Sequence, residues 1–239
     1  MKYLDQSQGT PAADLAADEA LLDLAEAGGL AGLLRFWEPV GRFVVLGYAN
    51  RAATEADLAA CAADGVAIYR RCSGGGTVLQ GPGCLNYTLV LPQGESGPLH
   101  TISGANQFIM ERQRAALQPL LPAPVDIAGH TDLVLGDRKF SGNAQRRKRR
   151  FLLFHGTFLL HCNLADLARY LRMPSQQPAY RGDRPHGDFV TNLGLSADAV
   201  KAALREAWSA HELLTELPEA AITDLVCERY GTEAWNRKW

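Results

Sequence analysis

The segment from Arg70 to Gln80 places two arginines shortly before three consecutive glycines. Glycines lack a Cβ, so the backbone N–H groups of such a turn can approach an anion or a flat ligand closely. An inward-pointing Arg71 guanidinium can hold a phosphate or a carboxylate in bidentate fashion. The alternative is a tight loop with solvated arginines, because glycine-rich turns are common. The segment therefore leaves two readings open, an anion-binding turn and a surface loop.

A second candidate for chemistry is Lys139, within the segment from Gly136 to Gln145. Neighbouring side chains of a strand face opposite sides, so either Arg138 or Lys139 can enter a pocket while the other is solvated. A pocket lysine suits an acyl-phosphate reaction, because its ammonium offsets charge on the carboxylate, the phosphoryl group and the leaving phosphate. Asp132 can hold Mg²⁺ there or orient the lysine. The alternative is a surface hairpin with a solvated lysine.

Five consecutive cations run from Arg146 to Arg150. Such a run is typical of the solvated tip of a hairpin, of a docking patch for an acidic protein domain, or of a nucleic-acid patch. No aromatic residue interrupts the run, so nucleic acid ranks last among these readings. The net charge of −2 also argues against a general nucleic-acid binder.

The cysteines offer a third kind of chemistry, because Cys72 and Cys84 lie close to the glycine turn. A thiol nucleophile needs a nearby base or cation, and the spacing of the histidines selects no pairing. A buried, inert thiol is the more common state. The complete set is odd in number and has no CxxC pair, which favours reduced thiols over a disulfide framework or a zinc site: Cys61, Cys72, Cys84, Cys162 and Cys227.

Length and composition describe the chain that carries these residues. With 239 residues, of which 47% are hydrophobic, the chain can bury a substantial core as one large domain or two small ones. Its apolar stretches fall far short of the ~18 residues that a membrane span requires. Residues 1–11 lack the basic and apolar regions of a secretory signal, so we expect a cytoplasmic protein without membrane partners.

Periodicity and turn residues predict the elements that position the candidates. Helices are expected over residues 13–27, 54–64, 102–117, 197–208 and 219–230. Strands are expected over 66–71 and 85–91, with two strands meeting at a turn within 33–47 and a three-stranded meander within 131–160. Residues 174–188 read as a long, mobile loop. The pattern indicates an α+β fold in a single domain.

Taken in order, these segments resemble the lipoate-protein ligase A family, within the superfamily that also holds biotin-protein ligases and octanoyltransferases. The resemblance spans nearly the whole chain, at residues 14–22, 37–39, 46–47, 70–78, 85–86, 131–134, 136–144, 155–160, 190–193, 228–231 and 235–236. Each motif alone is weak, but so many in the family's order make an accidental match improbable.

The resemblance implies a biotin/lipoate-ligase-like catalytic domain over residues 1–239, with mixed, largely antiparallel sheets flanked by helices and no C-terminal accessory domain. It implies activation of lipoate by ATP and Mg²⁺ to lipoyl-AMP, then transfer of the lipoyl group to a lysine of an acceptor. Lys139 falls on the family's catalytic lysine, and Asp132 matches a polar position near the metal. The implied substrate- and ATP-binding residues are Arg71, Ser73, Gly74, Gly75, Gly76, Thr77, Val78, Leu79, Asn86, Asp132 and Lys139.

The implied acceptors are the glycine cleavage H protein or the E2 lipoyl domains of 2-oxoacid dehydrogenases. Gln80 departs from the family, which usually has histidine there, and residues 184–189 are poor in basic side chains. The chain also ends three residues after Asn236, where many bacterial ligases continue into an accessory domain. Relatives without that domain need a separate small partner subunit for activation or perform only the transfer step.

Other functions therefore stay open. The main rival is a cysteine-dependent octanoyl or lipoyl transferase that works without ATP, although His130 stands where one transferase branch has cysteine. Cys162, which lies 23 residues after Lys139, is its alternative nucleophile. A biotin ligase fits less well, because the Lys139 segment follows the lipoate branch. A lipoyl-domain binding module without activity conflicts with the presence of Lys139 and Arg71.

Overall fold

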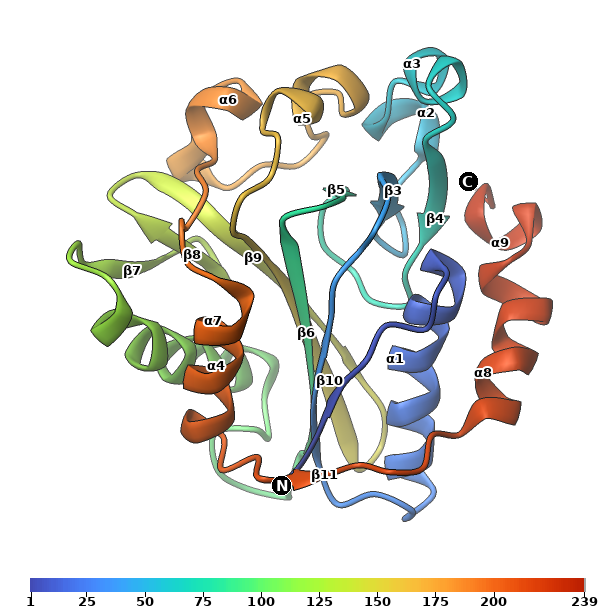
Figure 1. Cartoon of the computed structure of the whole chain (residues 1–239), viewed down its shortest axis with the longest axis vertical. Helices are drawn as coiled ribbons and strands as arrows, with labels where there is room; N and C mark the ends of the chain where they lie inside the picture. The colour runs from blue at the N-terminus through green and yellow to red at the C-terminus, as the bar shows by residue number, and fades with distance from the viewer. Residues whose placement is uncertain (239) are drawn as a thin grey trace.

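The computed structural model describes residues 1–238 and contains one large and one small β-sheet (Figure 1). The eight strands of the large sheet are, in spatial order, β11 (Glu212–Leu213), β1 (Lys2–Asp5), β2 (Leu33–Trp37), β6 (Cys84–Pro92), β10 (Phe151–Leu159), β9 (Arg138–Arg147), β8 (Asp132–Leu135) and β7 (Val125–Ala128). Strand β1 is parallel to both of its neighbours, and the other pairs are antiparallel. The small sheet has the order β4 (Ala67–Arg70), β3 (Phe43–Leu46) and β5 (Val78–Gln80).

Helices cover both faces of the large sheet (Figure 1). One face carries α1 (Pro11–Glu26), flanked by α8 (Glu219–Leu225), the π-helical turn Val226–Tyr230 and α9 (Glu233–Asn236). The other face carries α4 (Ile102–Leu117) and α7 (Ala197–Ala207), with the 3₁₀ turn Gln118–Leu120 after α4. Around the small sheet lie α2 (Ala52–Glu55), α3 (Leu58–Ala63), α5 (Ala165–Tyr170), the 3₁₀ turn Ala179–Arg181 and α6 (His186–Phe189).

The central strand β6 shows why this arrangement forms. Its first eight residues are all buried, as expected for a strand with helices on both faces. Tyr87 and Leu89 join the apolar cluster that includes α4 and α7, whereas Val90 packs in the cluster that includes α1. Because side chains alternate along a strand, Asn86 shares the α1 face with Val90. The same alternation in β10 sends Phe154 to the α4 face and His155 toward α1.

A buried cation joins α1 to the sheet. Arg35 of β2 is completely buried, and its guanidinium lies 2.5 Å from Asp14 Oδ1 and 2.7 Å from Asp18 Oδ1 of α1. It also donates to the backbone carbonyl of Asp14 at 2.9 Å. Buried charges are tolerated only when they are paired and hydrogen-bonded, so this cluster fixes the position of α1 on β2.

Most expected elements are confirmed, including the α+β fold class and the meander, which consists of β8, β9 and β10. The expectation that two strands within 33–47 meet at a turn is wrong, because β2 and β3 lie in different sheets. Alternation within each strand revealed its buried faces but not its partner strand. The expected helix 54–64 is interrupted, because Ala56 has an extended backbone and bridges to Leu171.

Two further segments differ in detail. The expected helix 219–230 comprises α8 and the π-helical turn that follows it. Residues 174–188 contain the 3₁₀ turn and the start of α6, and Arg184 links this segment to Asp137 at 2.6 Å. Within residues 1–238, no helix combines the length and the apolar character that a bilayer crossing demands.

We predict that Arg35→Met destabilises the protein by about 3–5 kcal/mol, because two buried carboxylates lose their cation. The free energy of unfolding, measured in urea, checks this value. Arg169→Met is the control. The ion pair of Arg169 with Asp64 lies at the surface, so we expect its loss to change the free energy of unfolding little. Equal losses in the two variants would contradict the role given to Arg35.

Candidate active site

Two adjoining cavities form a cleft between the large and the small sheet. The first, which we call the α1 cavity, has a volume of about 670 Å³ and includes Leu15, Trp37 and Arg71 in its wall. The second, the α6 cavity, has a volume of about 700 Å³ and includes Glu55 and Phe189. Both open to solvent. The residues that line both cavities are Thr77, Val78, Lys139, Gly142 and Thr157.

Lys139 stands at the junction of the two cavities. Its Nζ lies 2.8 Å from Asp132 Oδ1, and the Tyr180 hydroxyl donates to Asp132 Oδ2 at 2.7 Å. Gly142 provides the space for the ammonium, because a Cβ there would lie 2.5 Å from Nζ. Asp132 therefore makes the contact with the lysine that its predicted orienting role requires. Arg138 points away from the junction and donates to the carbonyl of Val190 at 2.8 Å.

Arg71 holds the glycine turn from inside the protein. The guanidinium is buried and donates to the carbonyls of Gly74 and Gly76, both at 2.7 Å. Burial lowers its pKa to about 10, so the group remains charged at neutral pH. Gly75 has φ +83° and requires glycine. The glycines of the turn are exposed, but Arg70 and Arg71 are both buried, so the expectation of solvated arginines is wrong.

Arg70 is also buried and serves a different purpose. Its guanidinium donates to the carbonyl of Asn50 at 2.7 Å and to that of Asn236 at 3.1 Å. Its backbone N–H donates to Asn236 Oδ1 at 2.9 Å. Arg70 thus ties the last helix of the described chain to the loop before α2, next to the residue that holds the glycine turn.

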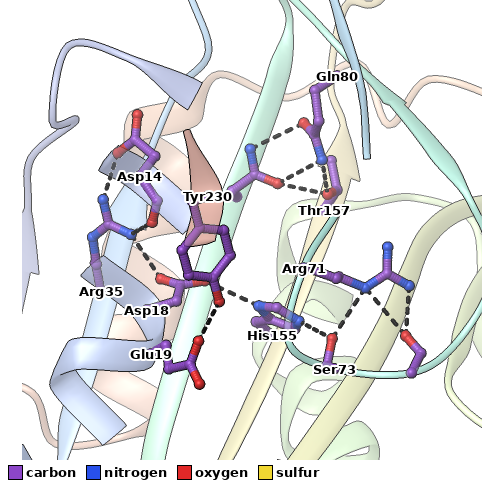
Figure 2. A network of polar contacts seen from close by, with 12 residues as sticks. Asp14, Asp18, Glu19, Arg35, Arg71, Ser73, Gln80, His155, Thr157 and Tyr230 are labelled. Carbon is purple, nitrogen blue, oxygen red and sulfur yellow. Dashed lines mark hydrogen bonds and ion pairs between the residues drawn. The ribbon is translucent and has the colours of Figure 1, made fainter. Parts of the chain in front are cut away.

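A buried polar chain runs from α1 to Arg71 (Figure 2). His155 Nδ1 lies 3.0 Å from Asp18 Oδ2, and His155 Nε2 lies 2.6 Å from Ser73 Oγ. Ser73 Oγ in turn accepts from Arg71 Nε at 3.0 Å. A carboxylate only accepts, so in the neutral imidazole Nδ1 carries the proton and Nε2 accepts from Ser73. Asp18 and His155 both line the α1 cavity.

The charge state of Asp18 follows from these contacts. Burial opposes ionisation of the carboxyl, but the hydrogen bond from His155 and the charge of Arg35 lower its pKa below the usual value. Asp18 and His155 lie within the family-like segments of the sequence, but no local pattern predicted a role for either residue. Their separation of 137 residues carries no local signal of contact.

Three uncharged side chains also line the α1 cavity, and Figure 2 shows two of them, Gln80 and Thr157. Gln80 and Asn86 exchange amide hydrogen bonds at 2.9 and 3.0 Å. The Thr157 hydroxyl donates to Asn86 Oδ1 at 2.6 Å. Gln80, the departure from the family pattern, is thus part of a network without a titrating group.

The other predicted binding residues divide into two sets. Gly76 lines the α1 cavity, Leu79 lines the α6 cavity, and Thr77 and Val78 line both. Ser73, Gly74 and Gly75 line neither cavity and belong to the turn that Arg71 holds, in which the two glycines are exposed. The predicted residues therefore lie around one cleft. Some of them line it, and the others form the turn next to the lining residues.

The cysteines lie outside the lining of the α1 and α6 cavities. Cys72 is buried, and desolvation together with the charge of Glu19 raises its pKa to about 12. Such a thiol is protonated and unreactive at neutral pH. Cys84 and Cys162 contact each other beside a third cavity.

The cationic run is only partly a solvated tip. Arg146 donates to the carbonyl of Cys72 at 3.0 Å, and Arg147 donates to the carbonyl of Leu99 at 2.8 Å. Lys148 pairs with Asp23 of α1. Exposed side chains remain at Arg149 and Arg150. A docking patch built on this run would therefore be small.

Within residues 1–238, no cluster of three or more His, Cys, Asp or Glu side chains is arranged to bind a metal ion. The carboxylate at the junction is Asp132, and both of its oxygens already accept hydrogen bonds. One carboxylate is nevertheless a usual protein contribution to a magnesium site that substrate phosphates complete. The residues present fit that shared type of site and not a cage made of protein alone.

Known proteins resemble this chain in sequence and in structure. Residues 10–209 match the model of the lipoyl protein ligase A/B catalytic domain. The chain is 26% identical to lipoate-protein ligase A subunit 1 of Thermoplasma acidophilum, over 97% of this chain and 94% of that protein. It is 27% identical to octanoyltransferase LipM of Kyrpidia tusciae, over 98% of this chain and 97% of that protein.

Solved structures agree. A lipoate-protein ligase A bound with ATP superimposes with a TM-score of 0.83 at 26% identity, covering 99% of this chain and 98% of that one. The bipartite lipoate protein ligase of Thermoplasma acidophilum shows the same fold, with a TM-score of 0.83 at 24% identity over 99% and 95% of the two chains. The family match covers most of the chain, and the resemblance noted in the sequence is confirmed: the chain belongs to the lipoyl protein ligase A/B catalytic-domain family.

Proposed function

We propose that this enzyme activates lipoate with ATP to lipoyl-AMP and then transfers the lipoyl group to a lysine of an acceptor lipoyl domain. The observation that carries the proposal is the position of Lys139 where the α1 and α6 cavities meet. Two substrates that react with each other must present their reacting atoms at a shared point. A cation at that point suits a reaction between a carboxylate and a phosphate.

The α1 cavity is the proposed site of the acyl chain. Leu15, Trp37 and Val45 give it apolar walls that fit a short aliphatic tail. Arg71 lies nearer the polar end, and its Nη1 makes a long contact of 3.5 Å with the carbonyl of Val45. Because that contact is long, the N–H groups of Nη1 can bind a carboxylate while Nε and Nη2 hold the glycine turn.

The α6 cavity is the proposed site of the nucleotide. Arg172 and Arg181 in its wall supply positive charge for phosphates, and Phe189 supplies a flat apolar surface. Glu55 is a buried acceptor in the same wall, held by the backbone N–H of Ser175 at 3.3 Å. A solved relative was determined with ATP bound, which supports the use of ATP by this protein.

The first step joins the lipoate carboxylate oxygen to the α-phosphorus of ATP, and the bond from that phosphorus to the β-phosphate bridge oxygen breaks. Pyrophosphate leaves and lipoyl-AMP remains. Lys139 stabilises the charge on the carboxylate, the phosphoryl group and the leaving group, as its position between the cavities allows. Asp132 and the phosphates together are the proposed ligands of Mg²⁺, which would neutralise phosphate charge when bound.

The second step is attack of the acceptor lysine amine on the acyl carbon. The bond from that carbon to the adenylate oxygen breaks, AMP leaves, and the amine loses a proton as the amide forms. Lys139 again lies beside the departing phosphate. No covalent enzyme intermediate is part of this route.

The proposed acceptors are E2 lipoyl domains of 2-oxoacid dehydrogenases or the glycine cleavage H protein. A solved bipartite relative was determined together with its E2 lipoyl domain, and a sequence relative is named as a subunit, which supports both a lipoyl-domain acceptor and a separate small partner subunit. Residues 1–239 would then act as a single catalytic domain in the cytoplasm.

An acyl transferase without ATP is the second candidate, because one relative is named octanoyltransferase. Such a route through a cysteine needs a thiol in the cleft. Cys72 is protonated and buried, and neither wall of the cleft includes a cysteine. These observations favour the ligase.

We predict that Lys139→Ala lowers formation of lipoyl-AMP by at least about 100-fold, because the reaction loses its stabilising cation. Incubation with lipoate, ATP and Mg²⁺, followed by measurement of pyrophosphate, tests this. Lys2→Ala is the matched control, because Lys2 lies in β1, next to the edge strand β11 and outside both cavity linings. If the unmutated chain only transfers lipoyl groups from supplied lipoyl-AMP, a partner subunit performs activation, and Lys139→Ala should then lower that transfer.

We also predict that Cys72→Ser keeps ligase activity and that native Cys72 resists alkylation at pH 8. Its pKa of about 12 leaves almost no thiolate at that pH. Iodoacetamide labelling with peptide mass spectrometry gives the readout, and exposed Cys227 is the internal control. Rapid labelling of Cys72, together with loss of acyl transfer in Cys72→Ser, would favour the transferase.

A further inference from the structure

Two thiols that the proposed reaction does not use lie in contact with each other. Cys84 Sγ and Cys162 Sγ are 3.3 Å apart, although the residues are separated by 78 positions in the sequence. Both cysteines are free. The pair lies at one end of β6, where the chain leaves the neighbouring strand β10.

The backbone holds both cysteines in place. The carbonyl of Gly83 accepts from the N–H of Leu160 at 2.9 Å and from that of His161 at 3.2 Å, which joins the segments on which the thiols sit. Asn192 fixes Cys162 further, since its side chain accepts from the Cys162 N–H at 3.0 Å and donates to the Cys162 carbonyl at 2.9 Å. The close approach of the two sulfurs is therefore set by the fold.

The two thiols differ in accessibility. They line a third cavity of about 640 Å³, together with Arg42, His161 and Asp166. Cys84 is buried, whereas Cys162 is partly exposed. The hydrogen bond from Cys84 lowers the pKa of the Cys162 thiol, although burial opposes this shift. A reagent that enters the cavity would therefore react first at Cys162.

We propose that Cys84 and Cys162 form a redox modification site that closes to a disulfide by exchange with a linear low-molecular-weight disulfide. The Cys162 thiolate attacks one sulfur of that disulfide, its S–S bond breaks, and one thiol leaves. Cys84 loses its proton and attacks Cys162 Sγ, and the second thiol leaves. The cysteine pair is oxidised by two electrons, and the reagent is reduced to two thiols.

The geometry requires little movement for this closure. A disulfide needs its sulfurs about 2.05 Å apart, so the contact of 3.3 Å shortens by a little over 1 Å. The new bond would link β6 to the segment after β10 across 78 positions. A link over so long a loop restricts the unfolded chain strongly, and we expect the melting temperature to rise by roughly 5 °C or more.

Oxidised glutathione is the probe for the test, and Cys227→Ser is the parent variant because it removes an exposed thiol. After treatment with oxidised glutathione, we expect the parent to contain two fewer free thiols. Its mass should fall by that of two hydrogen atoms, and no glutathione should remain attached. Peptide mapping should find Cys84 linked to Cys162. The melting temperature should rise, and dithiothreitol should reverse the change.

Two variants in the same background separate the steps. Cys84→Ser should keep one glutathione on Cys162 and show no thermal gain, and Cys162→Ser should stay unmodified at Cys84. Mapping of the parent does not depend on the folding of either variant. A parent that stays fully reduced in excess oxidised glutathione, or that keeps a stable glutathione on Cys162, would overturn the proposal.

Discussion

The buried ion cluster of Arg35, Asp14 and Asp18 is the constraint from which the site is built. A guanidinium with no exposure cannot remain unpaired, so α1 must place both carboxylates against β2. The second carboxylate oxygen of Asp18 is hydrogen-bonded to Nδ1 of His155, and Nε2 of His155 is hydrogen-bonded to the Ser73 hydroxyl. The Ser73 hydroxyl continues this series of hydrogen bonds to Arg71, which holds the glycine turn. The helix that closes one face of the core therefore also fixes the wall of the α1 cavity.

A second set of contacts reaches the glycine turn from the opposite direction. Arg70 binds carbonyls before α2 and in α9, so the end of the described chain is packed against β4, which ends at Arg70 directly before Arg71. The two adjacent arginines thus have different structural roles. Arg70 joins distant backbone segments, and Arg71 holds the glycine turn. Both are buried, and each satisfies its charge with carbonyl oxygens in place of carboxylates. Such a site is pre-organised before any substrate arrives.

The sequence alone predicted the residues whose signal is local. The meander, α1 and α4 follow from periodicity, and Lys139 and Arg71 follow from residue type within short motifs. What it missed depends on contacts across the chain. Local alternation could not separate β2 from β3 into two sheets, nor could it bring His155 to Asp18. The burial of Arg70 was missed for the same reason, because its partners are carbonyls of distant segments.

The protein contains both buried and partly exposed ion pairs, and this difference in burial matches a difference in role. The pair of Arg35 with Asp18 is fully enclosed, so an exchange of partner would leave a charge without compensation. The pair of Lys139 with Asp132 borders the cleft, with 26% of the lysine side chain exposed. Water and incoming oxygens can replace part of that contact at little cost. The enclosed pair of Arg35 with Asp18 therefore fixes the wall of the α1 cavity. The accessible pair of Lys139 with Asp132 leaves the lysine able to move from a carboxylate to a phosphate during the proposed reaction.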